Sequence, residues 1–386
     1  MLNVGIVAGE ASGDRLGAGL VRALRMRVAG LRVSGIAGPQ MRAAGVESIV
    51  DAERLSVMGF AEVAARLPEL LSIRARVRRH FLAERPDVFV GVDAPDFNLG
   101  LEAGLRRGGI RTVHYVSPTV WAWREGRLRT IRAAADLVLA IFPFEEDYYR
   151  ARGMAARFVG HPLADAVPEY PDRGAARAAL GLEAARPVLA VLPGSRASEL
   201  AQHLDAFLET AAICARQVPG LQIAVPAVDE RALARIRAAM AGRSGLPARS
   251  FLQRAQDVLA AADAVLTASG TATIETMLSG RPMVVAYRMA PLSFAIIRRL
   301  VRVQHCSMVN LLAGQPLVPE FVQDAMRPDA MARALVAWLR DPASAAPMLE
   351  RFAALRATLR HPPGADANAA EAVLAVAAGR MPPACP

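Results

Sequence analysis

Two carboxylates follow one short apolar segment of the chain, and only one of them has an evident structural role. Residues 88–92 are followed directly by Asp93-Ala94-Pro95-Asp96-Phe97-Asn98. Proline at position 95 is typical of the first turn of a helix, and Asp96 could cap that helix. Asp93 could be an ordinary loop residue. A carboxylate in this place could equally act as a general base that removes the proton of a hydroxyl group.

Three turns rich in small and hydroxyl residues also lie between an apolar segment and an expected helix. Their sequences are Gly9-Glu10-Ala11-Ser12-Gly13-Asp14, Gly194-Ser195-Arg196 and Ser269-Gly270-Thr271. Backbone N–H groups in such turns, at the N-terminus of a helix, can bind an anion. Arg196 could also bind a pyrophosphate through two parallel hydrogen bonds. Glu275, one turn into the last of these helices, could accept hydrogen bonds from ribose hydroxyls.

Each of these turns also has a purely structural interpretation. Ser12 and Asp14, or Ser198 after Arg196, could do no more than cap the helix that follows. Glu275 could be an acidic residue favoured near the start of a helix. The glycines of the first turn do not follow the pattern G-x-G-x-x-G, so they do not indicate a dinucleotide site.

Aromatic residues concentrate in the segment 114–124. Two of the three tryptophans of the chain, Trp121 and Trp123, fall in it. Amphipathic rings in a loop are suited to contact with a sugar or a lipid, although they could equally pack between domains.

Short apolar segments alternate with stretches of helical periodicity, and this alternation predicts parallel sheets built from strand–helix–strand units. The apolar segments are 4–8, 88–92, 112–116, 137–142, 188–192, 221–225, 264–267 and 283–285. In an open sheet of this kind, ligands bind beyond the carboxyl ends of the strands. The turns described above come directly after the expected strands, where such a site would lie.

A stretch rich in proline and charge at 167–173 divides the series into two halves of similar size and class. We therefore expect an α/β protein with one Rossmann-like domain over 1–165 and another over 166–345, facing each other across a cleft. Residues 346–386 are expected to form helices that pack back on the protein or are exchanged in a dimer.

The composition excludes several classes of enzyme. All 46 basic residues are arginine, and the formal net charge is +10. Without lysine, the chain can be neither a Schiff-base enzyme, nor a pyridoxal-phosphate enzyme, nor a protein with a Walker A loop. The arginines are dispersed and aromatic residues make up only 5% of the chain. We therefore expect anionic small molecules and lipid headgroups as partners, and no nucleic acid.

The sequence indicates no metal, no cofactor and no membrane-spanning helix. Cys214, Cys306 and Cys385 have neither the spacing of metal ligands nor that of a disulfide framework.

The start of the chain lacks the basic residues of a signal peptide, and no charge-free apolar run reaches the roughly 18 residues of a membrane span. Segments 66–81 and 291–303 mix apolar residues with arginine, as interfacial helices do, although ordinary amphipathic helices or a dimer face would look alike. We expect a cytoplasmic protein that rests on an anionic membrane surface.

Longer motifs occur in a fixed order from about residue 7 to about residue 319. They are GEASGD, GPQM, VMGF-EV, GVDAPDFN, HYVSPTVWAWREGR, FPFE, FVGHPL, LPGSR-SE, ASGTATIE, PMVVAYR and VNLLAG, with a looser match in PPGADANAAEAVL. This ordered set resembles the lipid-A-disaccharide synthase family. The longest motif is the most specific, and chance agreement of the whole set is implausible.

The resemblance implies an inverting, metal-independent glycosyltransferase of the GT-B type. Such an enzyme joins UDP-2,3-diacylglucosamine to 2,3-diacylglucosamine 1-phosphate, giving a β-1,6-linked disaccharide 1-phosphate and UDP. It would work at the inner face of the inner membrane of a Gram-negative bacterium, and a homodimer fits the family.

The resemblance also implies roles for residues of this chain. Asp93 becomes the general base. The first domain becomes the acceptor side, with a loop formed by Glu10, Ser12, Gly13 and Asp14. Arg196 becomes a contact to a phosphate or to the acceptor, and Asn310 a residue of the cleft. From these roles and the turns described above, we expect the second domain to bind the donor and its phosphates through Ser195, Arg196, Ser269, Gly270, Thr271, Glu275 and Asn310.

Two other classes of function stay open on sequence grounds. The first is a different GT-B enzyme, such as an N-acetylglucosaminyltransferase of cell-wall synthesis or a UDP-sugar 2-epimerase, because a fold alone does not settle the substrate. The second is a non-catalytic nucleotide-binding or membrane-scaffolding protein. Incubation with UDP-GlcNAc alone would reveal an epimerase, and release of UDP with both acylated substrates would exclude a scaffold.

Overall fold

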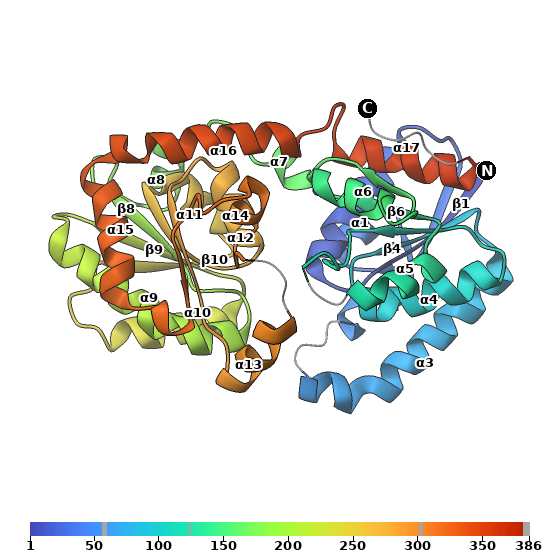
Figure 1. The fold of residues 1–386 in the computed structure, drawn as a ribbon, viewed down its shortest axis with the longest axis horizontal. Helices are drawn as coiled ribbons and strands as arrows, with labels where there is room; N and C mark the ends of the chain where they lie inside the picture. The colour runs from blue at the N-terminus through green and yellow to red at the C-terminus, as the bar shows by residue number, and fades with distance from the viewer. Residues whose placement is uncertain (56–59, 123–124, 301–303, 381–386) are drawn as a thin grey trace. The chain divides into compact units, whose positions relative to one another are not determined.

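The computed structural model describes residues 1–55, 60–122, 125–300 and 304–380, and the chain divides into two compact units (Figure 1). Unit 1 comprises Met1–Asp165 together with Leu359–Pro386, and unit 2 comprises Ala166–Thr358. Each unit is a parallel β-sheet with helices packed on its faces, as the alternating sequence pattern predicts.

The sheet of unit 1 has the strand order β3-β2-β1-β4-β5-β6-β7, with every pairing parallel. Its strands are β1 (Leu2–Ala8), β2 (Leu31–Ala37), β3 (Glu47–Asp51), β4 (Val88–Val92), β5 (Thr112–Tyr115), β6 (Leu137–Ala140) and β7 (Ala156–Phe158). Its helices are α1 (Ala11–Arg25), α2 (Pro39–Ala43), α3 (Phe60–Glu84), α4 (Pro95–Arg107), α5 (Leu128–Ala134), α6 (Pro143–Arg150), α7 (Pro162–Ala166, which ends at the boundary) and α17 (Ala365–Ala377).

The sheet of unit 2 has the strand order β10-β9-β8-β11-β12-β13 and is also parallel throughout. Its strands are β8 (Val188–Leu192), β9 (Gln222–Ala227), β10 (Ala248–Leu252), β11 (Ala264–Ala268), β12 (Met283–Tyr287) and β13 (Glu320–Val322). Its helices are α8 (Arg173–Ala179), α9 (Ala197–Gln217), α10 (Glu230–Ala241), α11 (Ala255–Ala261), α12 (Thr271–Leu278), α13 (Pro291–Leu300), α14 (Met308–Ala313), α15 (Pro328–Arg340) and α16 (Ala346–Leu359).

Alternate residues of the strands form separate cores on the two faces of the unit 1 sheet. Val4 and Ile6 of β1 pack in one core, together with residues of α1 and α17. Val7, which lies between Ile6 and Ala8 in the strand, packs in the other core with Phe81 of α3 and Leu101 of α4. Because both faces are buried, the central strands read as continuous apolar runs.

In each sheet the strand order reverses direction beside the first strand. β1 lies between β2 and β4, and β8 lies between β9 and β11. Ligands of doubly wound sheets bind at this point, because the chain leaves the two central strands toward opposite faces and a crevice opens between the connections. The turns after β1, β4, β8 and β11 are the four in which the sequence analysis places chemistry.

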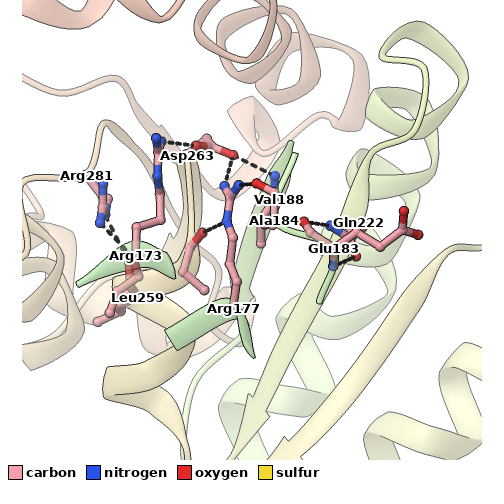
Figure 2. Close-up of polar contacts among 11 residues, drawn as sticks. Arg173, Arg177, Glu183, Ala184, Val188, Gln222, Leu259, Asp263 and Arg281 are labelled. Atoms are coloured by element: carbon pink, nitrogen blue, oxygen red, sulfur yellow. Dashed lines mark hydrogen bonds and ion pairs between the residues drawn. The ribbon is translucent and has the colours of Figure 1, made fainter. Parts of the chain in front are cut away.

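At the opposite end of the unit 2 sheet, Asp263 joins α8 to the starts of the central strands (Figure 2). Its Oδ2 accepts the backbone N–H of Val188 at 2.8 Å and the guanidinium of Arg177 at 2.6 Å, and its Oδ1 accepts Arg173 at 2.8 Å. The buried Arg177 also donates to Ala261 O at 3.0 Å. This network fastens the first helix after the linker to the sheet.

The segment 346–386 does not form a single group of helices in the structure. Helix α16 belongs to unit 2, whereas α17 returns to unit 1, where Ala369 and Val373 join the core beside α1. Asp165, at the point where the chain leaves unit 1, accepts the backbone N–H of Ala365 at 2.8 Å. The chain therefore re-enters unit 1 beside the place where it left.

Candidate functional site

Asp93 lies one residue beyond β4 in a turn of unusual backbone conformation. Its N–H donates to Tyr115 O at 2.8 Å, which extends the pairing of β4 with β5. The φ angles of Asp93 (52°) and Ala94 (44°) both lie in the left-handed region, which residues other than glycine rarely adopt. Its side chain is half-buried, and the carboxylate forms no hydrogen bond or ion pair with any residue that the structure describes.

The turn after β1 packs directly against the turn after β4. A Cβ atom on Gly9 would lie 3.2 Å from Ala94 Cβ, and one on Gly13 would lie 3.4 Å from Val92 O. A side chain on Gly9 would therefore be crowded, whereas one on Gly13 would make ordinary van der Waals contact. Glu10 and Ser12 are exposed on the same turn. The structure thus brings the expected acceptor-side loop and the expected base to one edge of the sheet.

Asp14 has a structural role at this edge, because its carboxylate is used by the start of α2. It is buried, and its two carboxylate oxygens accept the backbone N–H groups of Gln40 at 2.8 Å and Met41 at 3.0 Å. Asp14 therefore caps α2 rather than its own helix, and α1 has no side-chain cap at all. The structural interpretation in which Ser12 and Asp14 cap α1 is wrong, because the helix already begins at Ala11.

The aromatic segment after β5 is held by a buried carboxylate. Glu145 accepts the indole N–H of Trp121 at 3.0 Å and the backbone N–H of Phe142 at 3.2 Å. Burial raises the pKa of Glu145 to about 7, although these hydrogen bonds lower it in part. The ring of Trp121 packs edge-on against Phe144, at 4.9 Å between ring centres. Trp123 lies outside the described residues.

In unit 2, the carboxylate of Glu199 occupies the turn after β8. Glu199 Oε2 accepts the backbone N–H groups of Ser195 at 3.0 Å and Arg196 at 3.2 Å, and its Oε1 accepts the Arg196 guanidinium at 2.9 Å. Two of the backbone donors that were expected to bind a pyrophosphate, those of Ser195 and Arg196, are thus already used. Ser198 does not cap α9, because the N-cap position is occupied by Arg196. The Arg196 side chain is nevertheless 54% exposed.

The turn after β11 leaves the start of α12 open. Gly270 has a φ of 147°, α12 has no side-chain cap, and no atom lies within 4 Å of a Cβ placed on Gly270. Thr271 is exposed, while the Ser269 hydroxyl donates to Cys306 O at 2.6 Å. Glu275 lies farther along α12 and lines a hollow of about 340 Å³ with the linker and α11. Glu275 is thus placed beside the linker and α11, one helical turn from Gly270.

Asn310 is enclosed rather than presented to a ligand. It is 1% exposed. Its amide nitrogen donates to Val318 O at 2.9 Å and Glu320 Oε1 at 2.8 Å, and its oxygen accepts Leu317 and Val318 N–H, each at 2.8 Å. Glu320 also accepts the N–H of Cys306 at 3.0 Å, so Asn310 and Ser269 belong to one network. Asn310 supports the edge of the sheet, and these four hydrogen bonds use its side-chain amide in full.

The described residues hold neither a cluster of metal ligands nor a membrane-spanning helix. They contain no group of three or more histidine, cysteine or acidic side chains that could hold a metal ion. No helix among them is both long enough and apolar enough to cross a membrane.

With this geometry in place, the sequence was compared with known proteins. The sequence model of the lipid-A-disaccharide synthetase family matches residues 4–358. The chain belongs to the lipid-A-disaccharide synthase family. The synthase of Alkalilimnicola ehrlichii is 50% identical over 381 residues, which are 98% of this chain and 99% of that protein. The synthase of Pseudomonas aeruginosa is 50% identical over 373 residues, or 97% of each chain. This lipid-A-disaccharide synthase is thus a UDP-sugar glycosyltransferase of lipid A biosynthesis.

Solved structures share the GT-B fold with this synthase at low sequence identity. A calicheamicin glycosyltransferase is 17% identical with a TM-score of 0.60, covering 98% of this chain and 99% of the other. MurG of Acinetobacter baumannii is 16% identical with a TM-score of 0.59, covering 97% and 99%. The UDP-GlcNAc 2-epimerase of Neisseria meningitidis is 10% identical with a TM-score of 0.65, covering 98% and 100%. At these identities the likeness shows the fold alone.

Sequence reasoning assigned no role to several polar residues that hold these turns in the synthase. Glu145 and Glu199 each occupy the third helical position and accept the N–H of the N-cap residue, but the N-caps are Phe142 and Arg196 rather than the serine or threonine of a capping box, so that sequence signal is absent. His203 bridges Pro193 O at 2.9 Å and the N–H of Arg288 at 3.0 Å, at the end of β12. No local pattern indicates that contact, because its partners are far apart in the sequence.

Proposed function

We propose that this synthase transfers the diacylglucosamine of UDP-2,3-diacylglucosamine to 2,3-diacylglucosamine 1-phosphate. The 6-hydroxyl oxygen of the acceptor attacks the anomeric carbon of the donor while the bond from that carbon to UDP breaks. Asp93 takes the hydroxyl proton, and configuration at the anomeric carbon inverts. The products are the β-1,6-linked disaccharide 1-phosphate and UDP. Family membership and the environment of Asp93 together support this assignment.

The observation that carries the proposal is the combination of a fixed backbone and an unoccupied carboxylate at Asp93. Carboxylates elsewhere at these edges, such as Asp14 and Glu199, are used by backbone N–H groups of the protein. A general base needs lone pairs that are available to the incoming hydroxyl. Asp93 meets this requirement at the strand-order reversal of unit 1, where α/β sheets bind ligands.

The donor diphosphate is assigned to unit 2. The exposed guanidinium of Arg196 and the open start of α12 at Gly270 and Thr271 provide cationic and N–H donors on the turns after β8 and β11. These two strands are neighbours in the sheet, so both turns lie at the same carboxyl edge. Positive potential there would stabilise the negative charge that develops on departing UDP. Ser195 and Ser269 shape the two turns through the contacts described above.

The acylated substrates require a surface on which their chains can remain in lipid. Helix α3 buries Ile73, Val77 and Phe81 but exposes Leu67 and Leu71, with exposed fractions of 48% and 45%. On α13, Arg298 and Arg299 are exposed. Apolar and arginine side chains on a surface helix are suited to an anionic membrane interface. We propose peripheral association of the synthase with such a membrane.

The deciding experiment is mass spectrometry of the product formed from the two acylated glucosamines. A tetraacyl disaccharide 1-phosphate, accompanied by one UDP per disaccharide, is the expected product. A matched reaction that contains UDP-GlcNAc in place of both substrates should yield neither UDP nor UDP-N-acetylmannosamine. Epimerisation in that control, with no disaccharide in the main reaction, would contradict the proposal.

A further inference from the structure

We propose that Asn98 is the positioning residue that fixes the general base Asp93, an inference that rests on the function proposed above. Asn98 lies in the first turn and a half of α4 and is fully buried. Its amide nitrogen donates to Asp93 O at 2.8 Å and to Val92 O at 3.2 Å. The same nitrogen lies 3.4 Å from Val7 O of β1. One side chain thus joins the ends of β1 and β4 to the residue that carries the carboxylate.

The backbone of Asp93 is held at both of its peptide groups. Its N–H donates to Tyr115 O on the neighbouring strand at 2.8 Å, and its C=O accepts the Asn98 amide. Between these two anchors the chain adopts two consecutive left-handed conformations, at Asp93 and Ala94. Non-glycine residues keep such conformations only where the surroundings impose them. Among the described residues, Asn98 supplies the side-chain hydrogen bond within this turn, and together with the backbone bond to Tyr115 it holds the conformation.

The chemistry of the contact requires an amide at position 98. All three oxygens around the Asn98 nitrogen are backbone carbonyls, which only accept hydrogen bonds. A carboxylate in the same place would present oxygen to oxygen, and an apolar side chain would leave the Asp93 carbonyl without its donor. An asparagine supplies an uncharged N–H donor in a site that is closed to water.

A second polar contact fixes the register of α4 against the sheet, one turn after Asn98. Glu102 Oε1 lies 2.8 Å from His114 Nδ1 of β5, with both side chains fully buried. The same oxygen would lie 1.9 Å from a Cβ on Gly91, so β4 accommodates Glu102 only because residue 91 is glycine. The helix therefore cannot slide along β4, and Asn98 stays beneath the Asp93 turn.

The test compares two buried asparagines with the same kind of contact in the same unit. Asn368 of α17 is also buried and donates from its amide to Val159 O at 3.1 Å and to His361 O at 2.7 Å, away from the Asp93 turn. Asn98→Ala and Asn368→Ala thus remove equivalent donors. Both variants should lower Tm by similar amounts. Only Asn98→Ala should lower kcat, by about 10²-fold, because a reacting group displaced by about 1 Å costs a rate factor of that size.

The split between kcat and KM identifies positioning. Removing Asn98 should leave KM for both substrates close to wild type, because the expected substrate contacts are made by other residues. Asn98→Leu keeps the branching at Cγ, has no donor and leaves no cavity. It should show the same loss of kcat, which makes the test independent of a cavity and of the folding of the alanine variant. A loss of kcat no larger than that of Asn368→Ala, or a raised KM with unchanged kcat, would overturn the inference.

Asp93→Asn, measured in parallel, separates this inference from the proposed function. If Asp93→Asn turns over like wild type, the assignment of the base fails, and the role of Asn98 in positioning it fails with it. If Asp93→Asn is inactive while the Asn98 variants behave like Asn368→Ala, the proposed function stands and only the inference about Asn98 is rejected.

Discussion

The carboxylate of Glu199 binds Arg196 twice, through its backbone N–H at 3.2 Å and through its guanidinium at 2.9 Å. The Glu199 side chain therefore accepts a backbone N–H at the start of α9 and also orients the guanidinium of Arg196. The guanidinium has five N–H donors, and this pairing leaves donors on an exposed side chain for an anionic ligand. The exposed guanidinium of Arg196 can therefore contact a phosphate at the outer surface of the turn, while Glu199 binds the N–H groups at its inner side.

Replacing Arg196 with alanine should lower kcat/KM more than it lowers stability. Loss of hydrogen bonds to a charged group corresponds to about 10- to 100-fold in kcat/KM. Arg196→Lys should recover part of this loss, because lysine supplies charge but cannot form two parallel hydrogen bonds. Steady-state kinetics with varied UDP-sugar, alongside thermal denaturation, checks both variants. Full activity of Arg196→Lys would show that charge alone suffices.

Removal of the Asp93 carboxylate should abolish most of the turnover of a folded protein. Loss of a general base costs roughly 10²–10⁴-fold in rate. Asp93→Ala and Asp93→Asn should both show this loss in a UDP-release assay. Asp14→Asn serves as a contrast, because its defect should appear in thermal stability, through the cap of α2. Turnover of the Asp93 variants at the wild-type rate would move the search for the base to Glu10.

The stability of the protein should depend on pH through Glu145. Its pKa in the folded protein, about 7, is above its usual value of 4.5, so the folded state holds the proton more tightly. The stability that this proton provides is present below pH 4.5 and is lost as the pH rises through 7. Relative to Glu145→Gln, the wild type should lose on the order of 3 kcal/mol of unfolding free energy over that range.

Urea denaturation at pH 5 and pH 8 measures this difference. Glu209→Gln is the matched control, because Glu209 is exposed on α9 and its substitution should give nearly the same difference at both pH values. A difference between wild type and Glu145→Gln that does not change with pH would contradict the interpretation of Glu145 as a buried carboxylate.

Chelators should leave the activity unchanged. The charge on departing UDP is assigned to Arg196 and the start of α12, and the described part of the chain holds no cluster of metal ligands. The assay is UDP release with and without EDTA after dialysis. An EDTA-dependent loss that magnesium restores would refute the metal-independent mechanism.

Membrane binding should weaken when the arginines of α13 are removed. Each arginine near anionic lipid contributes on the order of 1 kcal/mol, so Arg298→Gln with Arg299→Gln should reduce vesicle affinity by roughly tenfold or more. Sedimentation with anionic vesicles at low and high salt measures the vesicle affinity of each variant. The control pair is Arg231→Gln with Arg237→Gln on α10, which removes the same charge from another surface. Equal binding by both double variants would place the contact elsewhere, with 66–81 tested next.

All interior strands except β2 are predicted from the sequence, whereas none of the edge strands β3, β7, β10 and β13 is. Segments 88–92 and 188–192 coincide with β4 and β8 residue for residue, because strands buried on both faces are uninterrupted apolar runs. The edge strand β10 contains Arg249 and Ser250 and is only half-buried, so it shows no such run. The same holds for β3, whose first residues are exposed.

The positions of the site turns were predictable, but the partners of their side chains were not. The turns follow apolar strands, and a parallel sheet brings the carboxyl ends of its strands to one edge. Asp14 and Asn310 are polar residues in motifs, which is equally consistent with ligand contact and with a buried cap. Only the fold shows that the backbone N–H groups of Gln40 and Met41 donate to the carboxylate of Asp14. Likewise, only the fold shows that those of Leu317 and Val318 donate to the amide oxygen of Asn310.

The return of α17 to unit 1 has a consequence for the order in which the protein is made. When residue 165 has been synthesised, the surface of α1 and β1 that Ala369 and Val373 cover is still bare. At roughly 5–20 residues per second, the ribosome needs about 10–40 s more to reach α17. During this interval the whole of unit 2 is synthesised. The amino-terminal half, which carries Asp93, is therefore the last part of the protein to acquire its complete core.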